Sequence, residues 1–442
     1  MKTILTKFVK SYENIGLGNQ LFLLGVFFLP SALPIGALFL LISVFISFQN
    51  KKHILINDIW DKLFIFCIIL IIISTFNICF INTPNELVDF NKSLIWLNLF
   101  NWLPIIIFYF GFKNYLINRV QKELFAKYLI SGSIPVIFSC FLQKFFNLYG
   151  PFETLFGSII WFNRTTSGPI SGLFNKPNYL GLWLTLCLPF SIMRLKDEKK
   201  LTNKIFLLLI NILILYFTLE THSRNALIGI VITCLLVFNL RKLIIFSLFS
   251  ILGIFLVVYL PPILLDIQTL SFLDFPSSNV VERFRNNETD FLTYPRILIF
   301  KRTISLILER PFWGWGGATF AHLYSEKQFY IIPFRFISYQ HAHNLVLELA
   351  YNFGIPLSFL YTFNVSKIFL TSFKKTFILK NYSFLHYNKP WVAAFAVFLF
   401  SQMYDLTYYD GRISLLSCIL FSGIKNSINE TPAPKNLIKK TK

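Results

Sequence analysis

Long apolar runs set the strongest constraint on what this chain can fold into. Crossing the apolar core of a bilayer takes about 20 residues in a helix, and several runs approach or reach that length. Over the whole chain, 55% of residues are hydrophobic and the mean hydropathy is +0.61, which is rare for a soluble domain. The clearest runs are 63–81, 93–112, 205–219, 225–240 and 243–261. The pattern predicts an all-α, polytopic integral membrane bundle.

Run length and charge placement together predict about 12 transmembrane helices in a single integral membrane domain, 1–442. Between two of them lies a long connection, 263–343, and long loops tend to be functional. Within it, apolar residues recur at helical spacing over 296–310, which predicts a short amphipathic helix in the membrane interface. The predicted spans are 18–31, 34–49, 62–81, 93–112, 124–146, 178–194, 204–220, 224–240, 242–262, 344–370, 390–405 and 411–425.

The formal charge of +20 is distributed unevenly between the connections. With the N-terminus in the cytoplasm, one set of connections and the C-terminal tail carry most lysines and arginines, and the opposite short connections carry few. This asymmetry is the positive-inside pattern, with both termini cytoplasmic and the long loop outside. The basic charge therefore predicts topology and contact with anionic membrane lipids rather than nucleic acid binding.

Two histidines and an asparagine stand where the long polar loop ends and an apolar run begins. Imidazole is the side chain best suited to proton transfer near neutral pH, so His343 is a candidate general base and His341 a weaker candidate. Asn344 and Glu348 are four residues apart and share one helix face. The alternative is that Asn344 caps the helix and the histidines are solvated loop residues.

Basic residues at predicted helix starts on the outer side form a second group. Arg224 opens one apolar run and Arg296 opens the amphipathic helix, and helix N-termini favour anions. A planar guanidinium also suits phosphate oxygens. Either arginine could instead be a simple interfacial anchor. Arg164 and Lys176, in the smaller outer loop 147–177, are further binding candidates that spacing alone does not separate from solvated charges.

A metal site is a further possibility for the histidine segment. His341 and His343 would need a third ligand, and the acids of the long loop could supply one, although nothing in their spacing fixes a geometry. The sequence therefore predicts no metal and no cofactor.

Four segments form a pattern: Ser171-Gly172-Leu173-Phe174-Asn175-Lys176-Pro177-Asn178, His222-Ser223-Arg224-Asn225-Ala226, Arg296 with Pro311-Phe312-Trp313-Gly314-Trp315-Gly316, and His343-Asn344 with Glu348 and Gly354-Ile355-Pro356. Together these segments resemble the family of O-antigen ligases and O-antigen polymerases, which are polytopic membrane glycosyltransferases. The order and spacing of the segments make the resemblance specific, over about 165–370. Two residues depart from the pattern: Asn225 stands where a smaller residue is common, and Leu357 stands where glycine is common.

The resemblance implies a reaction at the periplasmic face of the bacterial inner membrane. The donor would be a glycan on undecaprenyl pyrophosphate, and the acceptor a hydroxyl of a glycolipid or glycan such as lipid A-core. Arg224 and Arg296, assisted by Arg164, would hold the pyrophosphate, and His343 would be the general base. Asn344 and Glu348 would hold the imidazole, with His341 and Lys176 as further substrate-binding residues.

Three functions remain open at this point. Ligation is the first prediction, and polymerisation of repeat units, which needs the same catalytic groups, is the second. The third is a flippase or transporter of the same lipid-linked glycan. Transporters more often show internal repeats and broken helices near the bilayer midplane, and this chain shows no internal repeat.

Overall fold

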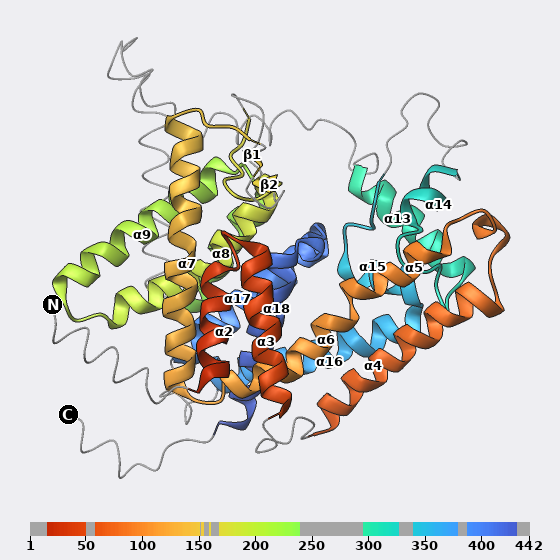
Figure 1. The fold of residues 1–442 in the computed structure, drawn as a ribbon, viewed down its shortest axis with the longest axis horizontal. Coiled ribbons are helices and arrows are strands. Elements are labelled where there is room, and N and C mark those ends of the chain that lie inside the picture. The colour runs from red at the N-terminus through yellow and green to blue at the C-terminus, as the bar shows by residue number, and fades with distance from the viewer. Residues whose placement is uncertain are drawn as a thin grey trace. The chain divides into compact units, whose positions relative to one another are not determined.

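The computed structural model describes residues 16–49, 58–150, 152–153, 159–160, 168–238, 295–326, 339–378 and 387–430. These residues form two compact units, one made of 1–136 with 290–442, and the other of 137–289. Figure 1 shows that both units are built from helices. The prediction of a single integral membrane domain is not decided by this division and stays a prediction.

The first unit contains most of the helices, with some short 3-10 and π turns between them. It begins with α2 (Leu17–Phe28), α3 (Leu33–Gln49), α4 (Ile59–Phe76), η1 (Asn77–Ile81), η2 (Asn85–Leu87), α5 (Lys92–Asn98), η3 (Leu99–Asn101), α6 (Leu103–Phe112), η4 (Lys113–Tyr115) and the larger part of α7 (Arg119–Phe145). It continues with α13 (Pro295–Glu309), α14 (Phe320–Glu326), α15 (Leu345–Phe353), α16 (Ile355–Phe373), η7 (Lys374–Ile378), α17 (Lys389–Tyr404), η9 (Thr407–Tyr409) and α18 (Gly411–Asn429).

The second unit is smaller and contains the end of α7, α8 (Pro177–Asp197), α9 (Leu201–Glu220) and α10 (Arg224–Val237). The helix α8 packs against both α9 and α10. A short antiparallel pair, β1 (Phe152–Glu153) and β2 (Ile159–Ile160), precedes α8, with Phe152 opposite Ile160. These two-residue strands do not alter the all-helical architecture that the sequence predicts.

Four helical segments among the described residues are long and apolar enough to cross a bilayer, by length and composition. They are Ile59–Ile81, Lys92–Tyr115, Arg119–Phe145 and Leu201–Glu220. Leu17–Phe28, Leu33–Gln49 and Arg224–Val237 are apolar but shorter. The chain is therefore an all-helical membrane protein, while the prediction of about twelve spans is not confirmed. The predicted span 242–262 lies outside the described residues.

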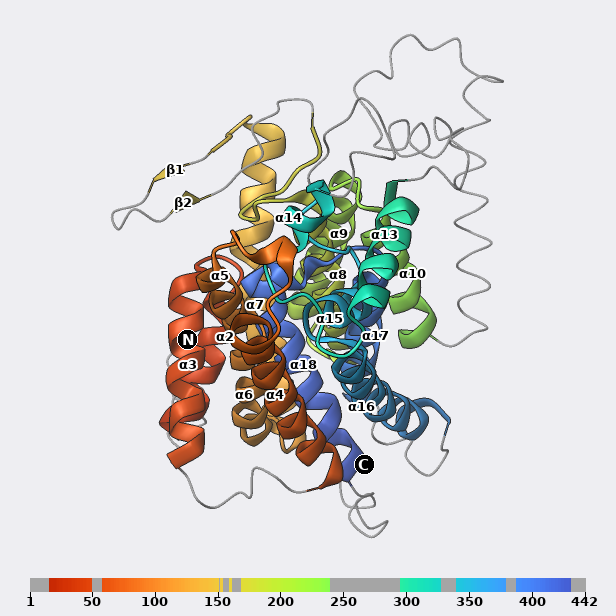
Figure 2. The ribbon, with the colours of Figure 1, turned by 90° about the vertical axis from the view of Figure 1, so that its right-hand side faces the viewer.

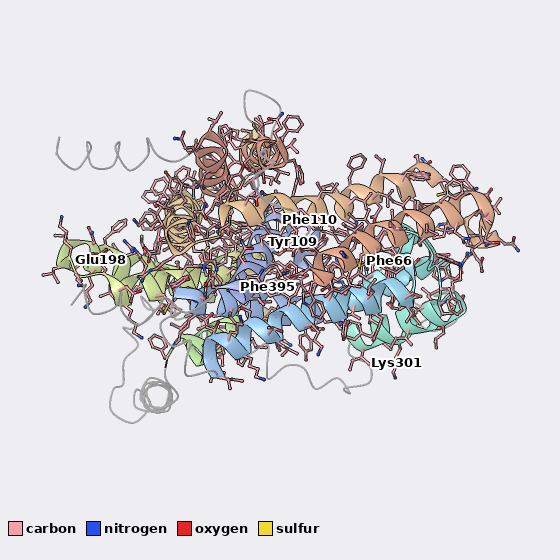
Figure 3. All side chains as sticks on the ribbon, turned by 90° about the horizontal axis from the view of Figure 1, so that it is seen from below. Phe66, Tyr109, Phe110, Glu198, Lys301 and Phe395 are labelled. Carbon is pink, nitrogen blue, oxygen red and sulfur yellow. The ribbon has the colours of Figure 1, made fainter. Side chains whose placement is uncertain are left out.

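Aromatic side chains fill the centre of the first unit. The ring of Phe421 on α18 lies 5.2 Å from that of Tyr109 and 5.4 Å from that of Phe395, measured between centroids. Tyr109 on α6 and Phe395 on α17 can be followed in Figure 3. Large rings therefore join α6, α17 and α18, as expected where apolar faces of helices meet.

The prediction of one continuous helix over 344–370 is wrong. The structure has two helices here, α15 and α16, separated by Gly354. The φ angle of Gly354 is +93°, which a helix cannot contain, and Pro356 has no backbone N–H with which to continue the helix. The nine-residue α15 is too short to cross a membrane and begins directly after the histidine segment.

By contrast, the predicted amphipathic helix at 296–310 is present as α13, Pro295–Glu309. It packs against α15, and the two helices lie side by side in Figure 2. A position for α13 in the membrane interface stays a prediction. The rest of the long loop, from 263 to 294, lies outside the described residues.

Candidate active site

The turn at 311–317 and the break between α15 and α16 are packed backbone against backbone. Helix ends leave carbonyl groups without partners, and this turn supplies donors to the last carbonyls of α15. The hydrogen bonds run from Trp315 N to Tyr351 O at 2.8 Å, from Gly316 N to Asn352 O at 3.0 Å, and from Ile355 N to Pro311 O at 2.7 Å.

Two glycines permit this close approach. A Cβ atom on Gly354 would lie 2.0 Å from the carbonyl oxygen of Phe312, and one on Gly314 would lie 2.4 Å from that of Tyr351. Both glycines also have positive φ, at +93° and +67°. The two glycine motifs in the sequence are thus two sides of one contact, which fixes where α15 ends and how it is oriented.

The start of α15 is fixed by Asn344. Its Oδ1 accepts hydrogen bonds from the backbone N–H groups of Val346 and Leu347, at 2.9 and 3.1 Å. Its Nδ2 donates to the carbonyl oxygen of Met403 at 3.0 Å, which ties α15 to the end of α17. The interpretation of Asn344 as a helix cap is therefore confirmed. Its role in substrate binding stays a prediction.

An aspartate holds the imidazole of His343. Nδ1 of His343 lies 3.2 Å from Oδ1 of Asp405, directly after α17. The two side chains are 23% and 10% exposed, so the pair is shielded but not sealed. With the proton on Nδ1, this N–H donates to the carboxylate and the lone pair of Nε2 is left to accept a proton.

The backbone of His343 is unusual. Its φ is +53°, a left-handed conformation that is uncommon for residues other than glycine, although histidine is among those that tolerate it. This φ turns the chain sharply between the loop and the Asn344 cap. Strained residues cluster at functional sites, so the conformation agrees with the candidate role of His343.

The hydrogen bonds of Glu348 go to the neighbouring backbone and to two side chains, and its charge also acts on His343. The residue is 2% exposed, and its carboxylate accepts hydrogen bonds from the backbone N–H of Ala342 at 2.8 Å and the hydroxyl of Tyr409 at 2.6 Å. Nδ2 of Asn352 donates a third, at 3.1 Å. Glu348 therefore anchors the residue before His343, while Asp405 contacts the ring. The expectation that Glu348 helps to hold the imidazole stays a prediction.

His341 completes the cluster on the side of Tyr409. The ring centroids of His341 and His343 are 4.2 Å apart, and that of His341 lies 5.9 Å from Tyr409. The structure thus brings together four of the predicted residues, His341, His343, Asn344 and Glu348. Arg296 belongs to the same unit, where it is half-buried in the first turn of α13.

The second unit holds Arg224 and Lys176 at neighbouring helix starts. Arg224 is the first residue of α10, and the Oγ of Ser223 caps that helix by accepting from Ala226 N at 3.4 Å. Lys176 precedes α8, and its Nζ lies 5.6 Å from the centroid of the Tyr179 ring. A Cβ on Gly181 would lie 2.9 Å from the Cβ of Ala226, so the first turns of α8 and α10 are in contact.

Two further contacts fix the loop that leads into α8. Oε1 of Gln143 accepts hydrogen bonds from the backbone N–H groups of Ser171 and Gly172, at 3.0 and 2.9 Å. Nζ of Lys144 lies 2.8 Å from Oε2 of Glu220, whose side chain is 5% exposed. The loop that leads to Lys176 is therefore held by α7, and α7 is in turn held to the end of α9. Arg164 lies outside the described residues.

Sequence reasoning missed Asp405, Tyr409 and Glu220. A signal for Asp405 did exist, because it is a carboxylate at the end of the predicted span 390–405, on the outer side in the predicted topology. A charge at such a boundary is a functional candidate in the same way as His343. Glu220 carries the same signal, because it is a carboxylate at the outer end of the predicted span 204–220. Tyr409 carries no comparable signal, since tyrosine is common at membrane boundaries.

No group of three or more His, Cys, Asp and Glu side chains that could hold a metal ion occurs within the described ranges. The acids at 274, 282, 288 and 290, which the sequence offers as possible third ligands, lie outside those ranges. The expectation of chemistry without a metal stays a prediction.

Comparison with known families bears on the same segments. Residues 209–362 match the family model described as O-Antigen ligase, a range that includes Arg224, Arg296 and His343. No curated protein matches the chain. The match confirms the resemblance for the segments at 222–226, 296–316 and 343–356, whereas the segment at 171–178 lies outside the matched range. Over that range the match supports the family of O-antigen ligases and polymerases.

Proposed function

We propose that this chain is a glycosyltransferase that moves a glycan from undecaprenyl pyrophosphate to an acceptor hydroxyl, in lipid A-core or a similar glycolipid. The observation that carries the proposal is the His343–Asp405 pair, with 3.2 Å between Nδ1 and Oδ1. A partly exposed imidazole held by a carboxylate is an arrangement suited to general-base catalysis.

In the proposed reaction, Nε2 of His343 takes the proton of the acceptor hydroxyl. The acceptor oxygen attacks the anomeric carbon of the donor sugar, and the bond from that carbon to the pyrophosphate oxygen breaks. The pyrophosphate leaves with the bonding electron pair, and the proton remains on the imidazole. Asp405 stabilises the imidazolium that forms, as a carboxylate does for a catalytic histidine.

The leaving group gains negative charge as its bond breaks. Arg224 and Arg296, with Arg164, would bind its oxygens, because guanidinium groups form paired hydrogen bonds with phosphate. Arg224 and Lys176 stand at helix starts, where the N–H groups of the first turn also favour anions. With the developing charge stabilised in this way, the proposed reaction requires no metal ion.

The proposed setting is the bacterial inner membrane, with both termini in the cytoplasm and the His343 cluster on the periplasmic side. The polyprenyl tail of the donor would lie against apolar helices in the bilayer. Exposed apolar residues on α4, such as Phe66 at 49% and Ile69 at 44%, are suited to contact with lipid chains.

Polymerisation of O-antigen repeat units is the second candidate. The family match covers both ligases and polymerases, and the same base and cations would serve either acceptor. A flippase is the alternative from another class, and the break at Gly354 is the feature that would fit it. The break, however, is closed by backbone hydrogen bonds from the 311–317 turn, which favours a fixed catalytic scaffold.

The experiment that tests the proposal is a deletion strain whose lipopolysaccharide is separated on a gel. A ligase predicts bare lipid A-core, with long glycan chains accumulating on undecaprenyl pyrophosphate. A polymerase predicts lipid A-core capped by a single repeat unit. Normal lipopolysaccharide with normal chain lengths would contradict both candidates.

A further inference from the structure

Arg302 occupies an unusual position on α13. Its neighbours Ile299, Thr303 and Leu306 are buried, and Arg302 itself is half-buried at the edge of their face. Its Nε and Nη2 atoms are shielded from solvent and have no hydrogen-bond partner within the described residues. A guanidinium carries five N–H donors, so this side chain holds hydrogen-bonding capacity that its surroundings do not use.

Arg310, directly after α13, has partners by comparison. Nη2 of Arg310 donates to the carbonyl oxygen of Asn82 at 2.9 Å, and its guanidinium lies 5.5 Å from the centroid of the Trp315 ring. Arg310 thus has a structural role in the packing of the 311–317 turn. A shielded charge without a hydrogen-bonded partner costs stability, so Arg302 calls for another explanation.

Two phenols within the described residues feel the charge of Arg302. Arg302 interacts electrostatically with Tyr324 on α14 and with Tyr351 on α15. Burial raises the pKa of the Tyr324 phenol, and the charge of Arg302 opposes that shift. The phenol therefore stays protonated and neutral at physiological pH, and it does not compensate the guanidinium charge.

Aromatic rings connect this position to the His343 cluster. The ring centroids of Tyr324 and Tyr339 are 5.3 Å apart, and those of Tyr339 and His343 are 6.1 Å apart. Tyrosine rings offer an apolar face and a polar hydroxyl, which suits a sugar with its apolar and hydroxyl-bearing sides. A glycan whose hydroxyl reached His343 would extend along these rings toward Arg302.

We propose that Arg302 binds an acidic group, a carboxylate or phosphate, carried by the glycan that approaches His343. This inference rests on the proposed function, since it assigns the glycan to the His343 cluster. The acidic group supplies the acceptors that the shielded N–H groups lack, and a charge-assisted hydrogen bond of this kind is strong. Arg302 is then a specificity residue, distinct from the residues proposed to hold the pyrophosphate.

The test compares Arg302→Met with wild type in purified full-length protein in lipid nanodiscs. The probes are a fluorescent lipid A-core glycolipid with its core phosphates and the same glycolipid after their removal. Wild type is expected to bind the phosphorylated probe at least about tenfold more tightly, and Arg302→Met is expected to lose that difference. Arg302→Lys retains the positive charge and should keep part of the difference in affinity between the two probes.

Lys301→Met is the matched control, because Lys301 is the adjacent residue on α13 and its exposed side chain points away from the bundle (Figure 3). It should bind both probes as wild type does. Thermal unfolding without a probe gives a second measurement. Arg302→Met is expected to unfold at the same temperature as wild type or higher, because it removes an uncompensated charge.

Equal binding of the two probes by wild type, or an unchanged preference in Arg302→Met, would overturn the inference. A lower unfolding temperature for Arg302→Met would also overturn it, by making the residue structural. If the proposed function is wrong and this inference is right, the same nanodiscs show no glycan transfer, while the charge-dependent binding of the probe remains.

Discussion

Two of the acid–base pairs in the first unit differ in how completely they are shielded from solvent. Lys113 and Asp61 form an ion pair at 2.7 Å, with side chains 7% and 0% exposed, and Asp61 also accepts a hydrogen bond from Tyr109 at 2.7 Å. His343 and Asp405 are 3.2 Å apart and more exposed, at 23% and 10%. The lysine pair is sealed, whereas the histidine pair remains open to a reactant.

The two pairs belong to different helices, and α4 extends from the first pair toward the surroundings of the second. Asp61 lies in the first turn of α4, whereas η1, which continues α4, packs in the core cluster that includes Tyr351 of α15. The intervening residues span roughly 25 Å at 1.5 Å per residue. A buried, fully paired charge is a structural solution in a membrane protein, and a partly exposed, singly paired imidazole is a functional one.

The largest expected effect is the loss of transfer rate when the open His343–Asp405 pair is changed. His343→Ala should lower the rate of glycan transfer roughly 10²- to 10⁴-fold, the range expected for loss of a general base. The variant should remain folded in the membrane, because the ring is partly exposed and lies outside the buried apolar core. The assay is transfer from purified lipid-linked glycan by reconstituted protein. Wild-type activity would remove the histidine from the mechanism.

Substitutions in the sealed Lys113–Asp61 pair should instead lower the stability of the protein. Asp61→Ala leaves Lys113 buried without its carboxylate, which costs about 3–5 kcal/mol. The check is the midpoint of unfolding in detergent, compared with the double variant Asp61→Leu, Lys113→Met. The double variant removes both charges and should recover most of the loss. A double variant as unstable as Asp61→Ala would show that the lost charge partner is not the cause.

A smaller effect is expected at the helix break that positions the open pair. Gly354→Ala places a Cβ against the Phe312 carbonyl at a φ of +93°, which costs at least about 1–2 kcal/mol from the backbone alone. Both stability and transfer rate should fall. Gly16→Ala is the matched control, because nothing lies within 4 Å of a Cβ there. Equal behaviour of the two variants would argue against the backbone contact.

Much of the fold is readable from the sequence, because apolar runs and their boundaries depend on local composition. The predicted helices at 34–49, 204–220 and 296–310 correspond closely to α3, α9 and α13. The break at Gly354 was not predicted, although glycine and proline were both visible. Its cause is a carbonyl from a turn about 40 residues earlier, and such long-range contacts leave no periodic signal.

In the candidate site, likewise, only the residues that lie close together in the sequence were predictable. His341, His343, Asn344 and Glu348 were found because they cluster in the sequence at the mouth of an apolar run. Asp405 comes from a helix about 60 residues later, and only the packing of α15 against α17 brings it to the imidazole. Local chemistry was therefore predictable, whereas the partner that sets the histidine tautomer was not.

The most direct test of the central claim, that His343 and Asp405 act as one unit, is a double-mutant cycle on glycan transfer. His343→Gln, Asp405→Asn and the double variant are compared with wild type at saturating donor and acceptor. If the pair is one unit, Asp405→Asn lowers kcat by about 10–100-fold and the double variant is no slower than His343→Gln. If the two losses multiply instead, the residues act independently and the account is contradicted.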